Sequence, residues 1–208
     1  MKEDIIHLIR KDCSQLFIFF TAGKRFGLHL SPIDFFKESG IFNRNIMFLR
    51  DRERMHFMNG IGGNIDNFKK LIIHFKEFLA ASPWIKHVYC AGFSNGSLGS
   101  VLAGLHLNAE RVYSFAHRPG TYKGPCKYLD EQVSPRSFDL VEILNQQKIN
   151  TVFEFHFNVF SKDMLGCVKL RGLPNVKLKP YWAYGHNTLL TLNHRKRLNT
   201  IFPKFIGV

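Results

Sequence analysis

The sequence predicts an α/β protein with a mostly parallel sheet of about six strands and helices on both of its faces. Three observations predict this fold class. Short runs of β-favouring apolar residues alternate along the chain with segments whose apolar residues recur at helical spacing. The apolar runs are nearly continuous, which is typical of strands that are buried on both faces. Neither a linker nor an internal repeat interrupts the 208 residues, so residues 1–208 are expected to form a single domain.

The first half of the chain provides three strands and three helices. The apolar run 15–20 ends at a glycine-containing loop, and Ser31-Pro32 then starts a short helix, because serine caps free amides and proline suits the first helical position. A second apolar run ends in a cluster of charged residues, and a third follows Pro83. The expected strands are 15–20, 45–49 and 86–91, and the expected helices are 31–36, 66–81 and 97–107.

The second half repeats the alternation after a loop excursion. Four prolines and glycines fall between positions 117 and 125, which indicates a loop rather than a large cap domain over the sheet. The remaining strands are expected at 111–116, 151–160 and 176–184, and the remaining helices at 138–146, 164–170 and 187–201. Few residues precede the strand at 15–20, so opening antiparallel strands look missing or reduced to residues 5–9.

Composition limits the class of protein and its partners. No run of about 20 apolar residues and no signal peptide is seen, which excludes a transmembrane helix by sequence. The four cysteines are far apart and form no CxxC pair, so neither a metal site nor a disulfide framework is expected, and a reduced, cytoplasmic protein fits best. The net charge of +13 favours an anionic partner without choosing one. Nucleic acid is disfavoured, because basic residues are not interleaved with aromatic ones in one exposed stretch.

The chemistry is expected at the segment Gly92-Phe93-Ser94-Asn95-Gly96. It places the pattern G-x-S-x-G between an apolar strand and a helix of small residues, which is the context of a nucleophile elbow. The sharp turn strains the serine backbone, so the positions two before and two after it must be small, as Gly92 and Gly96 are. The helix N-terminus beneath Ser94 also directs amides at the reacting oxygen.

A serine hydroxyl becomes a good nucleophile when a histidine takes its proton and a carboxylate orients that histidine. His186 follows the last strand and Asp163 follows the strand before it, which gives the expected chain order serine, acid, histidine. The oxyanion is expected to meet the backbone amide of Asn95 and that of Ala22, with Thr21 as the alternative to Ala22.

Other candidates stay open at this point. His117 and His194 are weaker candidates for the base, and Asp139 is the alternative acid. His29 and Asp34 have the H-x-x-x-x-D spacing of glycerolipid acyltransferases, but a helix start lies between them. The loop 60–63 lacks the third glycine of a dinucleotide-binding motif and the lysine of a phosphate loop.

With these residues the chain resembles the α/β-hydrolase superfamily from Leu16 through the last helix. Three segments also look like a group of small bacterial proteins of this fold that are associated with surface-polysaccharide genes. They are residues 16–23, residues 48–51 with the 60–63 loop, and residues 92–96 with 185–187. The resemblance implies acyl transfer through a serine ester intermediate, and O-acetyltransferases of similar architecture use a sugar hydroxyl as the acceptor.

The expected function is therefore serine-dependent acyl transfer on an ester or thioester, as an esterase-type hydrolase or a carbohydrate O-acetyltransferase. The substrate would be a small ester, a thioester or a carbohydrate. No cofactor is expected, and acetyl-CoA would be a co-substrate only for an acetyltransferase; Arg50, Arg52 and Arg54 are candidate contacts for an anionic donor. The alternative is a non-catalytic protein of this fold that binds an anionic partner. The sequence does not predict the oligomeric state.

Overall fold

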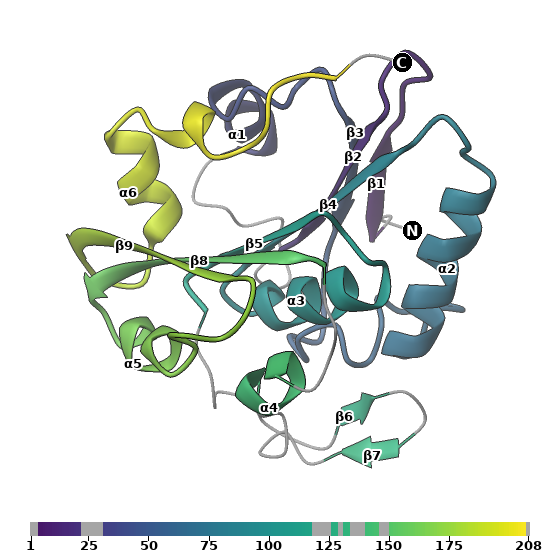
Figure 1. Cartoon of the computed structure of the whole chain (residues 1–208). Helices are drawn as coiled ribbons and strands as arrows, with labels where there is room; N and C mark the ends of the chain where they lie inside the picture. The colour runs from purple at the N-terminus through teal and green to yellow at the C-terminus, as the bar shows by residue number, and fades with distance from the viewer. Residues whose placement is uncertain are drawn as a thin grey trace.

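The structure is a computed structural model, and it describes residues 4–21, 31–117, 126–128, 131–133, 140–145 and 150–206. The chain forms a seven-stranded sheet with the strand order β1-β3-β2-β4-β5-β8-β9 (Figure 1). The strands are β1 (Ile5–Leu8), β2 (Gln15–Phe20), β3 (Asn45–Leu49), β4 (His87–Phe93), β5 (Arg111–Phe115), β8 (Val152–Phe160) and β9 (Val176–Tyr184).

All neighbouring strands from β3 to β9 are parallel, and β1 pairs antiparallel with β3 at one edge. The predicted mostly parallel sheet is thus confirmed, and the six predicted strands are its parallel part. The seventh strand, β1, occupies the segment where the sequence indicates reduced opening strands. An ion pair from Asp4 to Arg50, 2.8 Å long, and one to Arg52, 2.6 Å long, hold this edge.

Helices cover both faces of the sheet, as predicted (Figure 1). The helices are α1 (Pro32–Glu38), α2 (Phe68–Ala80), α3 (Gly96–His106), α4 (Leu140–Asn145), α5 (Asp163–Val168) and α6 (Thr188–His194). Leu16, Ile18 and Phe20 of β2 share a core with α2, α3, α4 and α5, whereas Phe17 and Phe19 share a second core with α1 and α6. Alternation of side chains along a strand explains this division, because a strand covered on both faces is apolar at every position.

The last helix is shorter than predicted. Helix α6 ends at His194, and a separate 3-10 helix spans Leu198–Thr200. The amide of Arg197 donates to the carbonyl of Leu192, and Lys196 has a φ of 53°, which together form a left-handed helix cap. This cap turns the chain so that Leu198 and Phe202 are buried in the second core. The energy of that burial favours ending the helix over extending it.

The predicted excursion after β5 contains a short antiparallel pair, β6 (Cys126–Tyr128) with β7 (Glu131–Val133). Within the described residues, this pair and α4 are the elements that lie between β5 and β8, so no large cap domain appears in that part of the chain. None of the helices in the described ranges is long and apolar enough to cross a membrane.

Candidate active site

The turn between β4 and α3 holds Ser94 in an unusual backbone conformation. β4 ends at Phe93, α3 begins at Gly96, and Ser94 has a φ of 51°. A non-glycine residue with positive φ is strained, and it persists only where its surroundings fix it. The amide of Ser94 donates to the carbonyl of Phe115 on β5 (2.9 Å), and the carbonyl of Ser94 accepts from the amide of Ser97 (3.0 Å). The strand-to-helix turn therefore presents the Ser94 hydroxyl at the carboxyl edge of the sheet.

The two glycines of the motif are required by close approach of the backbone. A Cβ atom on Gly92 would lie 2.2 Å from Oγ of Ser100 and 2.4 Å from the carbonyl oxygen of Gly96. A Cβ atom on Gly96 would lie 2.1 Å from the carbonyl oxygen of Phe20, at the end of β2. All three distances are far below van der Waals contact, so the turn can pack against α3 and β2 only with glycine at these positions.

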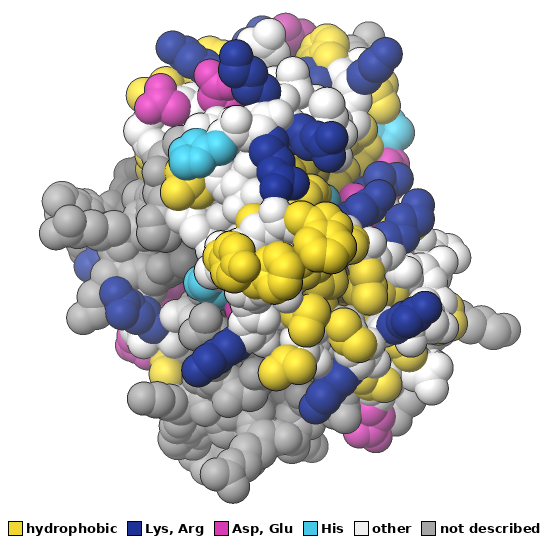
Figure 2. Space-filling view, turned by 90° about the vertical axis from the view of Figure 1, so that its left-hand side faces the viewer, with side chains coloured by type: hydrophobic (Ala, Val, Ile, Leu, Met, Phe, Trp, Pro, Cys, Tyr) yellow, Lys and Arg dark blue, Asp and Glu magenta, His cyan; other side chains and the backbone are white. Residues whose placement is uncertain are grey.

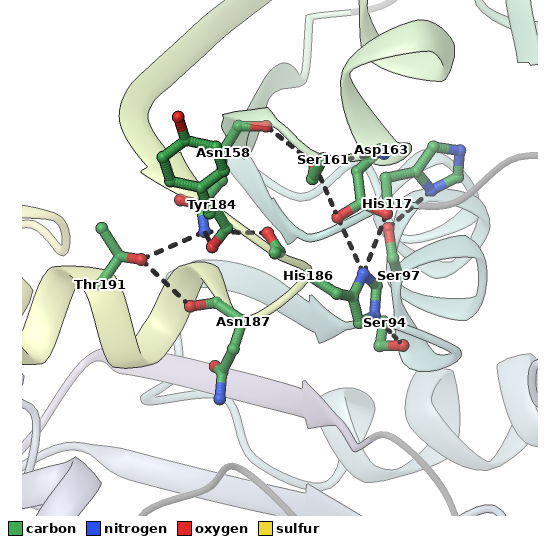
Figure 3. Close-up of polar contacts among 11 residues, drawn as sticks. Ser94, Ser97, His117, Asn158, Ser161, Asp163, Tyr184, His186, Asn187 and Thr191 are labelled. Carbon is green, nitrogen blue, oxygen red and sulfur yellow. Dashed lines mark hydrogen bonds and ion pairs between the residues drawn. The ribbon is translucent and has the colours of Figure 1, made fainter.

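The structure brings Ser94, His186 and Asp163 together, although 92 residues separate the first two in sequence (Figure 3). Nε2 of His186 lies 2.6 Å from Oγ of Ser94. Nδ1 of His186 lies 2.9 and 2.8 Å from the two carboxylate oxygens of Asp163. A carboxylate can only accept, so Nδ1 carries the proton and Nε2 of a neutral imidazole faces the hydroxyl as an acceptor. His186 is about one-third exposed at 34%, whereas Asp163 is fully buried.

Both partners are placed by the ends of the last two strands. His186 follows β9 through Gly185, whose φ of 79° suits glycine, and it precedes α6. Asp163 is the first residue of α5, which follows β8. The amide of Asp163 donates to Oγ of Ser161 (3.2 Å), which fixes the backbone that carries the carboxylate.

Asn158 ties these two strand ends together, and sequence reasoning did not single it out. It is fully buried, and its Nδ2 lies 3.3 Å from the carbonyl of Tyr184, 3.1 Å from that of Gly185 and 3.1 Å from Oγ1 of Thr191 (Figure 3). Its amide thus fixes the loop that carries His186. The signal that could have revealed it is an isolated amide within the otherwise phenylalanine-rich β8.

The predicted oxyanion residues have different outcomes. Asn95 occupies the N-cap of α3, where the first amides of a helix are free of intrahelical partners. Ala22 lies outside the described residues. The alternative, the amide of Thr21, donates to the carbonyl of Leu49 (3.2 Å), so it is used by the sheet and is a poor oxyanion donor. Asn95 and Ala22 remain predictions as oxyanion donors.

A second residue that sequence reasoning missed is His56, which contacts the turn that carries Ser94. Its Nδ1 donates to the carbonyl of Asn95 (2.8 Å). His56 has a φ of 58° and lies in a loop held by the buried carboxylate of Asp51, which accepts from the amides of Glu53 and Phe57, each at 3.0 Å. Burial lowers the pKa of His56 and raises that of Asp51. Nothing in the local sequence indicates that this loop would reach the serine turn.

His117, a weaker sequence candidate for the base, belongs to a neighbouring buried cluster. Its Nδ1 lies 2.7 Å from Oγ of Ser97 (Figure 3). The same Oγ of Ser97 also contacts Oγ of Ser114. Burial, helped by the nearby His56, lowers the pKa of His117 to about 4, so its imidazole is neutral near pH 7. His117 therefore contacts Ser97 rather than Ser94.

The remaining candidates lie apart from Ser94 or outside the described residues. His194 is exposed at the end of α6, and Asp34 is exposed at the start of α1, where it contacts Ser31. Asp139 and His29 lie outside the described residues. Arg50 and Arg52, which the sequence offers as contacts for an anionic donor, are instead paired with Asp4. The single carboxylate of Asp4 thus offsets part of their charge.

A serine, an imidazole and a buried carboxylate in this order can carry out one kind of chemistry. The imidazole can take the hydroxyl proton as the oxygen attacks a carbonyl carbon, and the carboxylate holds the tautomer that makes this transfer feasible. The positive φ of Ser94 and its place at a helix N-terminus add free amides beside the developing oxyanion.

Comparison with solved structures identifies the fold. The chain superposes on a putative α/β hydrolase of unknown function from Agrobacterium tumefaciens with a TM-score of 0.61 and 14% identity, covering 96% of this chain and 94% of that one. The Pyrococcus furiosus esterase Pf2001 gives a TM-score of 0.62 at 14% identity, with 92% and 82% covered. The carboxylesterase CesB from Bacillus subtilis gives 0.59 at 14% identity, with 94% and 84% covered.

No protein-family model and no curated protein matches the sequence. Identities near 14% between similar folds show shared architecture, because function depends on the site and not on the fold. The chain has the compact α/β-hydrolase fold.

Proposed function

We propose that this protein is a serine hydrolase of the esterase type, with Ser94 as nucleophile, His186 as general base and Asp163 as the group that orients His186. One observation carries the proposal: the imidazole of His186 lies 2.6 Å from Oγ of Ser94 and 2.8 Å from the carboxylate of Asp163. These distances are within hydrogen-bond reach on both sides of the ring, and they favour catalysis over the non-catalytic binding alternative.

The first half of the reaction makes an acyl-enzyme. Oγ of Ser94 attacks the ester carbonyl carbon as Nε2 of His186 takes its proton, and the carbonyl π electrons move to the oxygen. The amide of Asn95, and that of Ala22 if it completes the site, would stabilise the oxyanion. The C–O bond to the alcohol then breaks, and His186 returns its proton to the leaving alkoxide.

The second half releases the acid. A water molecule gives a proton to Nε2 of His186 and attacks the acyl carbon, and the tetrahedral intermediate collapses with the proton going back to Oγ of Ser94. Throughout, Asp163 keeps its carboxylate on Nδ1 and stabilises the imidazolium. Its complete burial strengthens this interaction, because the local dielectric constant is low.

Two neighbours of this fold, Pf2001 and CesB, are named as an esterase and a carboxylesterase, which supports an ester substrate in the proposal. Another neighbour, Est1E from Butyrivibrio proteoclasticus, is described with ferulic acid bound. An acyltransferase remains the finer alternative, since a sugar hydroxyl could replace water in the second half without any change in Ser94, His186 or Asp163. Incubation with acetyl-CoA and a capsular oligosaccharide distinguishes the two: acetate release without sugar acetylation supports the esterase, whereas acetylated sugar supports the O-acetyltransferase.

The main test is covalent labelling with a fluorophosphonate and hydrolysis of p-nitrophenyl acetate. We expect the wild-type protein to be labelled once and Ser94→Ala to lose both labelling and turnover. Ser97→Ala is a matched control, because it removes a buried hydroxyl from the same helix start that contacts His117 instead of His186. Labelling that persists in Ser94→Ala, or a correctly folded wild-type protein that is never labelled, would reject the proposal.

A further inference from the structure

A group of aromatic side chains is exposed where β8 and β9 end. Trp182 is 74% exposed, Tyr184 is 82% exposed and Phe160 is 47% exposed. The rings of Phe160 and Tyr184 are stacked with centroids 4.7 Å apart, and Trp182 meets Phe160 edge-on at 5.6 Å. We call Phe160, Trp182 and Tyr184 the aromatic patch. Large apolar rings this exposed are unfavourable in water unless something covers them.

Aliphatic side chains are exposed on the neighbouring helix. Leu165 is 66% exposed and Val168 is 48% exposed on α5, which packs against β8. Figure 2 shows hydrophobic side chains gathered on this side of the molecule, over the region where Figure 1 places α5, β8 and β9, with Lys and Arg side chains around them.

The exposed charge that the described residues 150–206 contribute to this side of the molecule has a single sign. Residues 150–208 contain two carboxylates, Glu154 and Asp163, and both are buried. The basic side chains of the described residues 150–206 are all exposed. These are Lys162, Lys169, Arg171, Lys177, Lys179, Arg195, Lys196, Arg197 and Lys204. One of them is directly beside the aromatic patch, since Nη2 of Arg195 donates to the carbonyl of Trp182 (2.5 Å).

Basic and aromatic side chains are exposed on the same strand, although they follow one another and are not interleaved. β9 is the edge strand of the sheet, and it exposes Lys177 and Lys179 followed by Trp182 and Tyr184. The sequence predicts a strand at 176–184, and its position at the edge of the sheet makes this strand part of the surface.

We propose that the aromatic patch, together with Leu165 and Val168, is a docking surface for an anionic lipid bilayer. Trp, Tyr and Phe favour the interface between headgroups and acyl chains, and surrounding Lys and Arg are attracted to anionic headgroups. Apolar contact plus a basic surround is the pair of signals that gives reversible membrane binding to a protein without a spanning helix.

Three observations favour a bilayer over other anionic or apolar partners. Leu165 and Val168 provide no flat ring for a base or a sugar, whereas they suit acyl chains. The rings of Phe160 and Tyr184 stack on each other, which removes one face of each ring from stacking with a base. A second copy of the chain would bring two sets of cationic side chains together across a two-fold interface, which is electrostatically unfavourable.

The surface lies beside the candidate active site. Tyr184 is two residues before His186, and Lys162 directly precedes Asp163. A bilayer on the aromatic patch would therefore hold the Ser94 hydroxyl close to ester groups at the membrane surface. The docking surface itself does not rest on the proposed function, because binding to vesicles is measured without turnover.

The test is flotation with phosphatidylcholine vesicles that contain or lack phosphatidylglycerol. We expect binding to the anionic vesicles that weakens by roughly tenfold or more when the salt concentration rises from about 0.1 M to about 0.5 M. The double variant Trp182→Ser/Tyr184→Ser should bind these vesicles at least about tenfold more weakly than the wild type, because it removes two exposed rings. Ile33→Ser is the matched control, since Ile33 is 58% exposed on α1 and lies outside the surface.

Fluorescence reports the contact directly. In Trp84→Phe the remaining tryptophan is Trp182, and its emission should shift to the blue and be quenched by brominated lipid. Ser94→Ala should bind as the wild type does, which keeps a failure of the docking surface distinct from a failure of the proposed function.

Three results would overturn the inference. The first is no binding to anionic vesicles, and the second is equal binding by the double variant. The third is evidence that another partner covers Trp182. That partner would be a second copy of the chain if the protein forms dimers that dissociate in Trp182→Ser/Tyr184→Ser. It would be a polyanion if the protein binds RNA or heparin but not vesicles.

Discussion

His117 gives a quantitative test of the buried polar cluster beneath the candidate site. Its pKa falls from 6.5 to about 4 on burial, so its imidazole stays neutral in the folded protein well below the pH at which it is protonated in the unfolded chain. This shift sets the direction in which stability changes with pH. The stability associated with this group is fully present above about pH 6.5 and is lost as the pH falls towards about 4, because the unfolded state then binds a proton that the native state does not.

The size of the effect follows from the two pKa values. A fall in pKa from 6.5 to about 4 changes the free energy of unfolding by roughly 3 kcal/mol over the whole pH range, at about 1.4 kcal/mol per pKa unit. Integration of the linkage relation gives a loss of roughly 2 kcal/mol between about pH 7.5 and about pH 5. For a chain of this length that corresponds to a fall in Tm of about 4–8 °C.

The assay is urea unfolding of the wild type and of His117→Asn at several pH values in that range. Asn keeps a polar atom near the position of Nδ1 beside Ser97 but does not titrate, so the variant should lose about 2 kcal/mol less than the wild type between the two pH values. Burial also lowers the pKa of His56, His106 and His156, so only the difference between the two proteins isolates His117. His194→Asn, at an exposed position, controls for the loss of one imidazole. Equal pH slopes in the wild type and His117→Asn would refute the reasoning.

Three further predictions concern the proposed site. Asp163→Asn should lower kcat on p-nitrophenyl acetate by a factor on the order of 10⁴ with a small change in KM, because an amide no longer holds the Nδ1 proton of His186. A loss of kcat below about tenfold would contradict the orienting role of Asp163. His56→Ala should lower kcat about tenfold by releasing the carbonyl of Asn95, whereas His56→Asn, which tolerates positive φ and keeps an amide donor, should retain most activity. Gly96→Ala should destabilise the fold by about 2 kcal/mol or more in urea unfolding, since its Cβ would lie 2.1 Å from a backbone oxygen of Phe20, and near wild-type stability would contradict that packing.

The parts of the fold predicted from sequence are those with strong local signals. The strands at 45–49 and 176–184 have the expected bounds. At 45–49 a nearly continuous apolar run with clear ends leaves few alternatives. The early end of α6 was not predicted, because the turn at Lys196 is stabilised by burial of Leu198 and Phe202 in a distant core. The helix propensities of residues 195–201 do not include the energy of that burial.

The same division applies to the candidate site. Ser94, Asp163 and His186 follow strands of a parallel sheet, and the carboxyl ends of such strands meet at one edge, so chain order and strand ends suffice to predict that they converge. His56 lies in a loop whose position depends on the buried carboxylate of Asp51 and on residues with positive φ. No sequence pattern predicts that conformation. Such supporting contacts are tertiary, and sequence reasoning on one chain does not reach them.

The end of β9 shows how one backbone irregularity can affect both proposals. Asn158 pairs with Tyr181, but Phe160 pairs with Tyr184, so β9 contains one more residue than β8 in this stretch. The shift lets the Asn158 amide reach the carbonyls of Tyr184 and Gly185, which sets the position of His186. It also places the ring of Tyr184 on that of Phe160, which forms the aromatic patch. Side chains of a regular strand alternate between its faces, so a strand without the extra residue would change the direction of Tyr184 and of the loop after it together. The proposed nucleophile activation and the proposed membrane contact therefore depend on the same bulge.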